Sequence, residues 1–368
     1  MPTVLIPRRD IRFFFTDTGA LDNTTGIDYT TLILVHGHTY HAAVFQKLLP
    51  LAAARSLRII CINRREYPGS TPHTAEELRV YASGSDEERA SLVSDAGINL
   101  ALAVDGIIQQ CALPSNGSVA LCGWSLGNTF VMAAMASILS LPSETRERLQ
   151  HFVKTIIMWD APTQSLGLVS PPNAYLPLHD RDLAPTDRGP AFAKWAGSYF
   201  IHGDLSSRQP DQLSYRNVDP SKKSTFEEMP MEELLEIVDF SVGDKCDTIL
   251  SQPPFASVLS ALVDKALFDL EIRGAWNNAE VAWMYGPANS GFIYFATWDV
   301  ERRIQAAGGN SWITFRRIEG ANHFVMWDDP SLTLDALLGL HKGLTWSFLS
   351  FLNKHAFSND LELPVDFG

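Results

Sequence analysis

Short, almost purely apolar runs recur along the chain, separated by stretches in which apolar residues return at helical spacing. Runs without polar alternation predict strands buried on both faces, as in a parallel sheet covered by helices. These runs are 31–35, 58–62, 118–122, 155–158, 279–285 and 312–318. A β-rich run at 11–16 predicts an early edge strand. The alternation predicts an α/β fold with a mostly parallel central sheet flanked by helices.

The stretches between these strands have mixed helical character. Helices are predicted at about 42–55, 97–111, 129–141, 294–307 and 334–353. Residues 71–95 are polar and predicted to be mostly loop, with some helix around the acidic residues 86–88. No internal repeat is present.

The alternation stops between residues 163 and 278. This segment contains no clear buried strand but has proline clusters and helical stretches, of which 231–240 and 257–271 are the best defined. More than a hundred such residues between two strands indicate a helical lid rather than a loop. The predicted organisation is a core of residues 1–162 and 279–368 with a cap or lid of residues 163–278.

Composition narrows the class of protein. The chain has 368 residues, 46% hydrophobic and 19% charged, which indicates a globular protein. Its net charge of −13 argues against nucleic-acid or anionic membrane partners. Cys61, Cys111, Cys122 and Cys246 lack metal-ligand spacing and are expected to be reduced. Without an apolar leader or a run of about 18 apolar residues, we expect a cytoplasmic protein, either a monomer or a homodimer.

The most informative stretch is Gly123-Trp124-Ser125-Leu126-Gly127, between a predicted strand and a predicted helix. A serine on such a turn is held in a strained backbone conformation, and the flanking glycines leave room for close approach. The N-terminus of the following helix would stabilise negative charge developing beside the serine. Ser125 is therefore a candidate catalytic nucleophile.

Four motifs in order resemble those of the α/β-hydrolases. They are His36-Gly37, the loop 64–70 (Arg-Arg-Glu-Tyr-Pro-Gly-Ser), the Gly-x-Ser-x-Gly around Ser125, and Gly320-Ala321-Asn322-His323. The resemblance extends over most of the chain and implies the α/β-hydrolase fold with its lid inserted between strands six and seven. It also implies that His323 is the general base, because the base of this family lies on a glycine-rich loop after the last strand.

The position of the acid is the open question. Most of the family carries it after strand seven, where this chain has Asn289 and Ser290. Strand six ends in Trp159-Asp160, which resembles the arrangement of zearalenone lactonase and certain fungal acyl-CoA hydrolases. Both strand ends border the same crevice, so either could orient the base. Asp160 is the preferred acid, and Asp299 is the alternative.

Further site residues are expected around this triad. The oxyanion hole would consist of the backbone N–H groups of Leu126 and His38. Aromatic residues near the motifs or in the lid predict a pocket for a sizeable apolar ligand. The candidate pocket residues are Trp124, Trp159, Tyr40, Trp195 and Tyr199. No metal site is expected, because His36, His38 and His41 lack carboxylate or cysteine partners.

The expected function is a cofactor-free serine hydrolase that cleaves an ester, lactone or thioester of a medium-sized apolar molecule, with a role in detoxification or secondary metabolism by analogy. Acyl transfer to another acceptor and a triad-dependent lyase reaction remain alternatives on the same fold. A ligand-binding or sensing protein that has lost turnover is the alternative of a different class. Ser125 argues against an epoxide hydrolase or haloalkane dehalogenase, because the nucleophile of those enzymes is an aspartate at this position.

Overall fold

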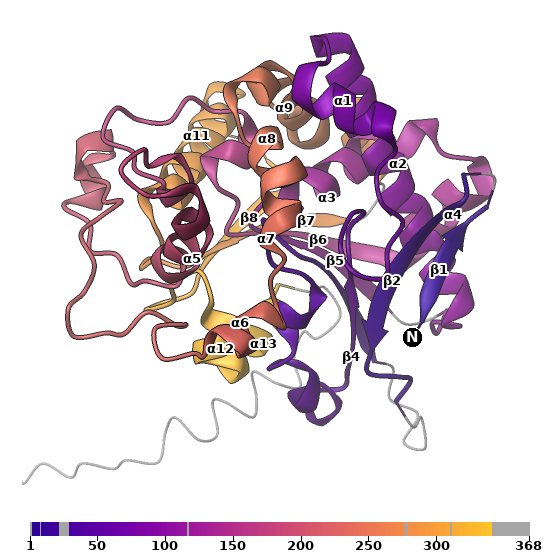
Figure 1. The fold of residues 1–368 in the computed structure, drawn as a ribbon. Coiled ribbons are helices and arrows are strands. Elements are labelled where there is room, and N and C mark those ends of the chain that lie inside the picture. Colours follow the sequence, from indigo (N-terminus) through magenta and orange to yellow (C-terminus); the bar gives the residue numbers. More distant parts are fainter. Residues whose placement is uncertain are drawn as a thin grey trace, which may run out of the picture.

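The computed structural model describes residues 2–7, 9–21, 29–115, 118–276, 279–309 and 311–340. Its centre is an eight-stranded sheet with the strand order β1-β2-β4-β3-β5-β6-β7-β8 (Figure 1). The strands are β1 (Thr3–Ile6), β2 (Ile11–Asp17), β3 (Thr30–Val35), β4 (Leu57–Ile62), β5 (Ser118–Trp124), β6 (Val153–Trp159), β7 (Glu280–Tyr285) and β8 (Ile313–Arg317).

Six strands, from β4 to β8 in the sheet order, run parallel, whereas β1 and β2 pair antiparallel at one edge. Each predicted strand is present within two or three residues, which confirms the predicted α/β fold with a mostly parallel sheet. Of the strands among the described residues, only β1 was not predicted. It is four residues long, so its sequence pattern is too short to recognise.

The two faces of the sheet are buried in two separate cores. Alternate residues of β3 show the division, because Ile33 and Val35 pack in one core and Leu32 and Leu34 in the other. Successive side chains of a strand point to opposite faces, so a continuously apolar strand supplies both cores. This explains why the central strands are mostly apolar.

The α-helices of the described residues flank both faces of this sheet (Figure 1). They are α1 (Ala75–Ser83), α2 (Asp86–Gln110), α3 (Gly127–Ala136), α4 (Ser143–Phe152), α5 (Pro185–Ala196), α6 (Met231–Leu235), α7 (Phe240–Val242), α8 (Thr248–Leu250), α9 (Ala256–Val263), α10 (Leu270–Ala275), α11 (Gly291–Ala306), α12 (Val325–Asp328) and α13 (Pro330–Leu338). The predicted helix 334–353 corresponds to α13, and its residues 341–353 lie outside the described residues.

Outside residues 163–278, two predictions of secondary structure were wrong. The predicted helix at 42–55 is three short 3₁₀ helices (Ala42–Phe45, Leu49–Leu51 and Ala53–Arg55). Residues 71–95, predicted to be mostly loop, form α1 and the first part of α2. Both helices begin with a capping box, in which a serine or threonine and a glutamate three residues later satisfy free N–H groups.

Helix α2 is long and apolar enough to cross a membrane, on length and composition alone. The sequence reading found no such stretch, because the helix also contains several charged residues. Its buried residues pack against α3 and in the core that contains Ile33 and Val35, and 61% of its most apolar window is buried. Core helices of globular proteins share this composition, so the helix is weak evidence for a membrane span.

The segment between β6 and β7, residues 163–278, is called the insert below. Its described residues form 3₁₀ helices, α5 to α10 and two π-helical turns at Gly243–Asp247 and Asp264–Phe268. The predicted helix 257–271 is broken by one of these turns, and 231–240 is helical only in α6 and at its last residue. In Figure 1 the insert, from α5 to α8, lies in front of and beside the central strands.

Candidate active site

Ser125 lies on the turn between β5 and α3, with a left-handed φ of 55°. Non-glycine residues rarely adopt this conformation, so it must be held by its surroundings. A Cβ atom at Gly127 would lie 2.3 Å from the carbonyl oxygen of Val35, and one at Gly37 would lie 2.6 Å from Cβ of Ser125. The glycines therefore allow the turn to pack tightly against the end of β3.

Asn128 fixes this turn to the end of β6. Its Nδ2 donates to the carbonyl oxygens of Ser125 (2.7 Å) and Trp159 (2.9 Å), and its Oδ1 accepts from the N–H of Trp159 (3.1 Å). The N–H of Ser125 also donates to the carbonyl oxygen of Trp159, at 2.9 Å. Asn128 is fully buried, so each bond is shielded from water. Sequence reasoning missed this residue, although it directly follows the Gly-x-Ser-x-Gly motif.

His323 and Asp160 lie together at the ends of β8 and β6. Nδ1 of His323 is 3.3 Å from Oδ2 of Asp160. Both atoms are buried, and among the described residues neither has another hydrogen-bond partner. Trp124 supports His323 from beneath, because its Nε1 donates to the carbonyl oxygen of His323 at 3.1 Å and its ring packs against the imidazole at 4.8 Å.

Asp160 is fully buried and, like Ser125, has a left-handed φ, of 46°. Burial raises the pKa of Asp160, and His323, the N–H of Gly286 and Asn289 offset only part of this effect. Oδ1 of Asp160 accepts from the N–H of Gly286 at 3.1 Å and from Nδ2 of Asn289 at 3.0 Å.

The alternative acid, Asp299, lies elsewhere. It sits within α11 and pairs with Arg302 and Arg303, at 2.5 and 2.7 Å. The structure therefore brings Asp160, and not Asp299, to His323.

The two candidate oxyanion donors are positioned next to the turn. Leu126 occupies the N-cap of α3, and His38 follows Gly37 at the end of β3. Within the described parts of the chain, neither backbone N–H has a hydrogen-bond acceptor. Both residues line the cavity that contains Ser125, which leaves the two N–H groups available to a ligand.

A buried ion pair holds the loop that carries His38. The guanidinium of Arg64 bonds Asp247 of the insert at 2.6 and 3.0 Å, and also donates to the carbonyl oxygens of His36 (3.2 Å) and Gly37 (2.8 Å). Burial opposes ionisation of Asp247, but Arg64 outweighs it and lowers the pKa of Asp247 to about 2. The insert and the loop after β3 are thus joined by a charged pair.

The side chain of His38 makes a second link to the insert. Its Nδ1 lies 2.6 Å from Oγ1 of Thr39, and its Nε2 lies 3.0 Å from Oγ1 of Thr248. Burial lowers the pKa of His38 to about 4, so the imidazole is neutral at pH 7. A neutral imidazole donates from one nitrogen and accepts at the other, which both threonine hydroxyls can match.

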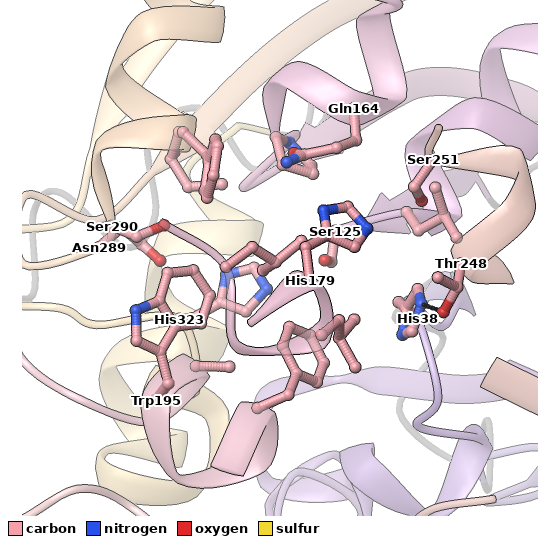
Figure 2. A pocket seen from close by; sticks show the side chains of 18 residues that line it. His38, Ser125, Gln164, His179, Trp195, Thr248, Ser251, Asn289, Ser290 and His323 are labelled. Atoms are coloured by element: carbon pink, nitrogen blue, oxygen red, sulfur yellow. Dashed lines mark hydrogen bonds between the residues drawn. The ribbon is translucent and has the colours of Figure 1, made fainter. Parts of the chain in front are cut away.

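A cavity of about 650 Å³, including its open mouth, lies over Ser125. The described residues that line it are His38, Ser125, Leu126, Pro162, Gln164, Leu176, Leu178, His179, Phe192, Trp195, Ala196, Thr248, Ser251, Asn289, Ser290, Phe292, Ile293 and His323. Figure 2 shows Ser125 in the middle of the cavity, with His38 and Thr248 on one side of it and Trp195 and Asn289 on the other. Most of the lining comes from the insert and from the start of α11.

Of the five predicted pocket residues, only Trp195 lines this cavity. Trp124, Trp159 and Tyr40 are at most 1% exposed and belong to the core beneath the site, so their prediction as pocket residues was wrong. Tyr199 lies outside the cavity and donates to Asp328 at 2.5 Å. A neighbour of a site residue on a strand points to the opposite face, which explains why proximity in sequence misled.

Sequence reasoning missed several residues that shape the cavity. His179, Phe192 and Thr248 come from the insert, where no motif distinguished them. Asn322, which belongs to the His323 motif but was given no role from the sequence, is fully buried and does not line the cavity; its Nδ2 donates to the carbonyl oxygen of Gly197 at 2.8 Å and so ties the His323 loop to the insert. Among the described residues, no three His, Cys, Asp or Glu side chains are grouped so as to hold a metal ion.

Solved structures with a similar fold include several enzymes. They are bromoperoxidase from Bacillus anthracis (13% identity, 92% of this chain and 98% of that chain, TM-score 0.44), a carboxylesterase of the thaumarchaeon Nitrososphaera gargenis (13%, 96% and 100%, 0.42) and a thermophilic esterase from Thermogutta terrifontis (14%, 92% and 96%, 0.41). At these identities the likeness concerns the fold alone. No curated protein matches the sequence.

A family model described as the alpha/beta hydrolase family matches residues 32–336. The match begins in β3 and ends in α13, so it includes the ends of all strands that carry Ser125, Asp160 and His323. Since the matched residues make up most of the sequence, the chain belongs to the alpha/beta hydrolase family.

Proposed function

We propose that the protein is a serine hydrolase with a catalytic triad of Ser125, His323 and Asp160. One observation carries this proposal: a serine in a left-handed conformation opens into the same cavity as a histidine whose Nδ1 lies 3.3 Å from a buried carboxylate. Such an arrangement can activate a hydroxyl, because the imidazole accepts its proton while the carboxylate orients the ring and stabilises its charged form.

These positions support the following reaction. Oγ of Ser125 attacks the substrate carbonyl carbon and loses its proton to Nε2 of His323, while the carbonyl oxygen becomes an oxyanion bound by the N–H groups of Leu126 and His38. His323 then protonates the leaving alcohol or thiol as the bond to the carbonyl carbon breaks. Water attacks the acyl-enzyme and passes a proton through His323 to Oγ of Ser125, which releases the carboxylic acid.

The cavity supports a medium-sized, mainly apolar substrate. Phe192, Trp195 and Phe292 offer aromatic surface, and Leu176 and Leu178 offer aliphatic surface. The insert supplies half of the residues that line the cavity, so we propose that it acts as a lid domain that sets specificity. An ester, lactone or thioester each presents a carbonyl that fits the oxyanion donors.

Two further assignments are part of the proposal. The acid after strand six is the basis of the resemblance to fungal lactonases and acyl-CoA hydrolases, and it favours a role in detoxification or secondary metabolism. All four cysteines are free, and three of them are buried. This supports a cytoplasmic enzyme, since reduced thiols persist in that compartment.

The decisive experiment combines a fluorophosphonate probe with a panel of aryl esters, lactones and acyl thioesters. The wild type should be labelled on Ser125 and should hydrolyse at least one substrate class, whereas Ser125→Ala should do neither. Asp160→Asn should retain the fold but lose turnover by about 10⁴-fold, as expected when the orienting carboxylate of a triad is lost. Asp299→Asn is the matched control and should retain turnover.

Other outcomes would select an alternative. A labelled enzyme that transfers the acyl group to an added alcohol or amine faster than to water would be an acyltransferase. A triad-dependent cleavage that proceeds without an acyl-enzyme would indicate a lyase. If the native protein is not labelled and binds ligands without turnover, it is a binding or sensing protein and the hydrolase assignment is wrong.

A further inference from the structure

Asn289 bridges the turn after β7 and the candidate acid after β6. Its Nδ2 lies 3.0 Å from Oδ1 of Asp160 and 3.1 Å from the carbonyl oxygen of Gly286. The side chain is 1% exposed and borders the cavity that contains Ser125 (Figure 2). The amide therefore joins the ends of two neighbouring parallel strands directly beneath the site.

The orientation of this amide is determined by its partners. Its nitrogen faces two oxygen acceptors, so a flip would place its oxygen against the carboxylate of Asp160 and the carbonyl of Gly286. Among the described residues, Oδ1 of Asn289 has no hydrogen-bond partner. The observed orientation leaves Oδ1 of Asn289 buried without a partner, which costs free energy. It keeps Nδ2 of Asn289 bonded to Asp160.

The carboxylate gains a fixed direction from this bond. Two donors, the N–H of Gly286 and Nδ2 of Asn289, occupy Oδ1 of Asp160, and only Oδ2 faces Nδ1 of His323. The turn that carries Asn289 is itself held against the loop of His323, since the N–H of Ala288 donates to the carbonyl oxygen of Ala321 at 2.9 Å. Loss of the amide donor would leave Oδ1 with one partner and let the carboxylate rotate.

We propose that Asn289 is a positioning residue, which holds the carboxylate of Asp160 so that Oδ2 orients the imidazole of His323. This inference rests on the proposed triad and extends it to the end of β7. Because asparagine and aspartate have the same shape, the acid and the amide should also be exchangeable between positions 160 and 289.

The first test removes the donor. Asn289→Ala should lower kcat by about 10- to 100-fold, since a hydrogen bond to a charged group contributes about 1.5–3 kcal/mol, while KM should change little. The acidic limb of the kcat/KM profile should move to higher pH, because the carboxylate of Asp160 loses a group that favours its charged form. A structural role alone would move neither quantity.

Asn99→Ala is the matched control for loss of a buried amide. Asn99 is 3% exposed, lies in α2 and accepts from Arg9. It should change stability without changing kcat or the position of the acidic limb. Thermal unfolding of both variants separates folding defects from effects on the reaction.

The second test exchanges the two groups. Asp160→Asn should be nearly inactive, and adding Asn289→Asp should raise its kcat at least tenfold, because a carboxylate returns to the same pair of strand ends. Asn289→Asp alone should be less active than wild type, since two carboxylates would then lie about 3 Å apart and repel each other.

The inference is overturned if Asn289→Ala retains wild-type kcat and pH profile, or if the double variant is no more active than Asp160→Asn. A failure of the proposed function gives a different result: the wild type itself would not be labelled or turn over. In that case, ¹³C titration of the Asp160 carboxyl group still decides the role of Asn289. Asn289→Ala should raise the pKa of Asp160, and an unchanged titration would refute the contact.

Discussion

The strand ends and the insert contribute to the same site in different ways. The ends of β3, β5, β6 and β8 carry His38, Ser125, Asp160 and His323, and their backbones are held by buried hydrogen bonds and close glycine contacts. The insert has short helices, 3₁₀ segments and π-helical turns, and it contributes side chains such as Phe192 to the cavity wall. The strand ends bring together the residues of the proposed triad, and the insert contributes half of the residues that line the cavity.

The two regions meet at a small number of buried polar contacts. Arg64 pairs with Asp247, and the side chain of His38 contacts Thr248. These contacts hold the loop that carries His38, a candidate oxyanion donor, so the position of the insert and the geometry of the site are linked. Disrupting each contact in turn tests how far the two regions are independent.

The largest effect is expected from the ion pair. Arg64→Ala leaves the carboxylate of Asp247 buried without its partner and removes donors to the carbonyl oxygens of His36 and Gly37. Breaking a buried pair in this way costs about 3–5 kcal/mol. Urea unfolding should show this loss, and turnover should fall because the loop of His38 is no longer fixed.

Arg79→Ala is the matched control, because Arg79 pairs with Glu76 and Glu88 on an exposed surface. Exposed pairs contribute little, so unfolding should be nearly unchanged. If Arg64→Ala and Arg79→Ala lost the same free energy of unfolding, the buried pair between the insert and the sheet would stabilise the fold no more than an exposed pair does.

The contact of the buried His38 with Thr248 should make the free energy of unfolding depend on pH. Burial lowers the pKa of His38 to about 4, below the value of 6.5 expected when the chain is unfolded. Between these values the unfolded chain binds a proton that the folded chain does not, so stability falls as pH decreases from 6.5 to 4, by roughly 3 kcal/mol at most. His38→Gln removes this titration. Unfolding at pH 7 and at about pH 4.5 should show a smaller acid loss in the variant, and an equal loss would contradict the contact.

A smaller effect is expected at the turn of Ser125, within the strand-end region itself. Asn128→Ala removes three buried bonds to the backbone of Ser125 and Trp159 and should cost about 2 kcal/mol. Labelling of Ser125 by the fluorophosphonate probe should also slow. Thr129→Val is the control, because this neighbouring hydroxyl is buried without a partner among the described residues and its loss should be nearly neutral.

Much of the strand-end region could be predicted because its physical requirements are local. A strand buried on both faces must be apolar, and a serine on a tight turn needs glycine neighbours, as at Gly123 and Gly127. The helices at 75–83 and 86–110 were also readable from their capping boxes, Thr74 with Glu77 and Ser85 with Glu88, although their polar composition obscured them.

The rest of the site depends on contacts between residues distant in sequence. Asp247 lies 183 residues from Arg64, and Asn289 lies 129 residues from Asp160. No local pattern marks such pairs. The prediction that Trp124 and Trp159 line the pocket failed because both side chains point from their strands into the core. There they support the site from beneath.

The smallest effect is expected where the insert forms the pocket wall. Trp195 lines the cavity, and its Nε1 donates to the carbonyl oxygen of Tyr215 at 2.8 Å. Trp195→Ala should raise KM about tenfold, equivalent to about 1.4 kcal/mol, with a smaller change in kcat, because a substrate bound as proposed would contact this residue away from its reacting atoms. Tyr199 lies outside the cavity, so the control Tyr199→Phe should leave KM and kcat unchanged. If Trp195→Ala instead lowered kcat with KM constant, the insert would take part in the chemistry, and the division between the two regions would fail.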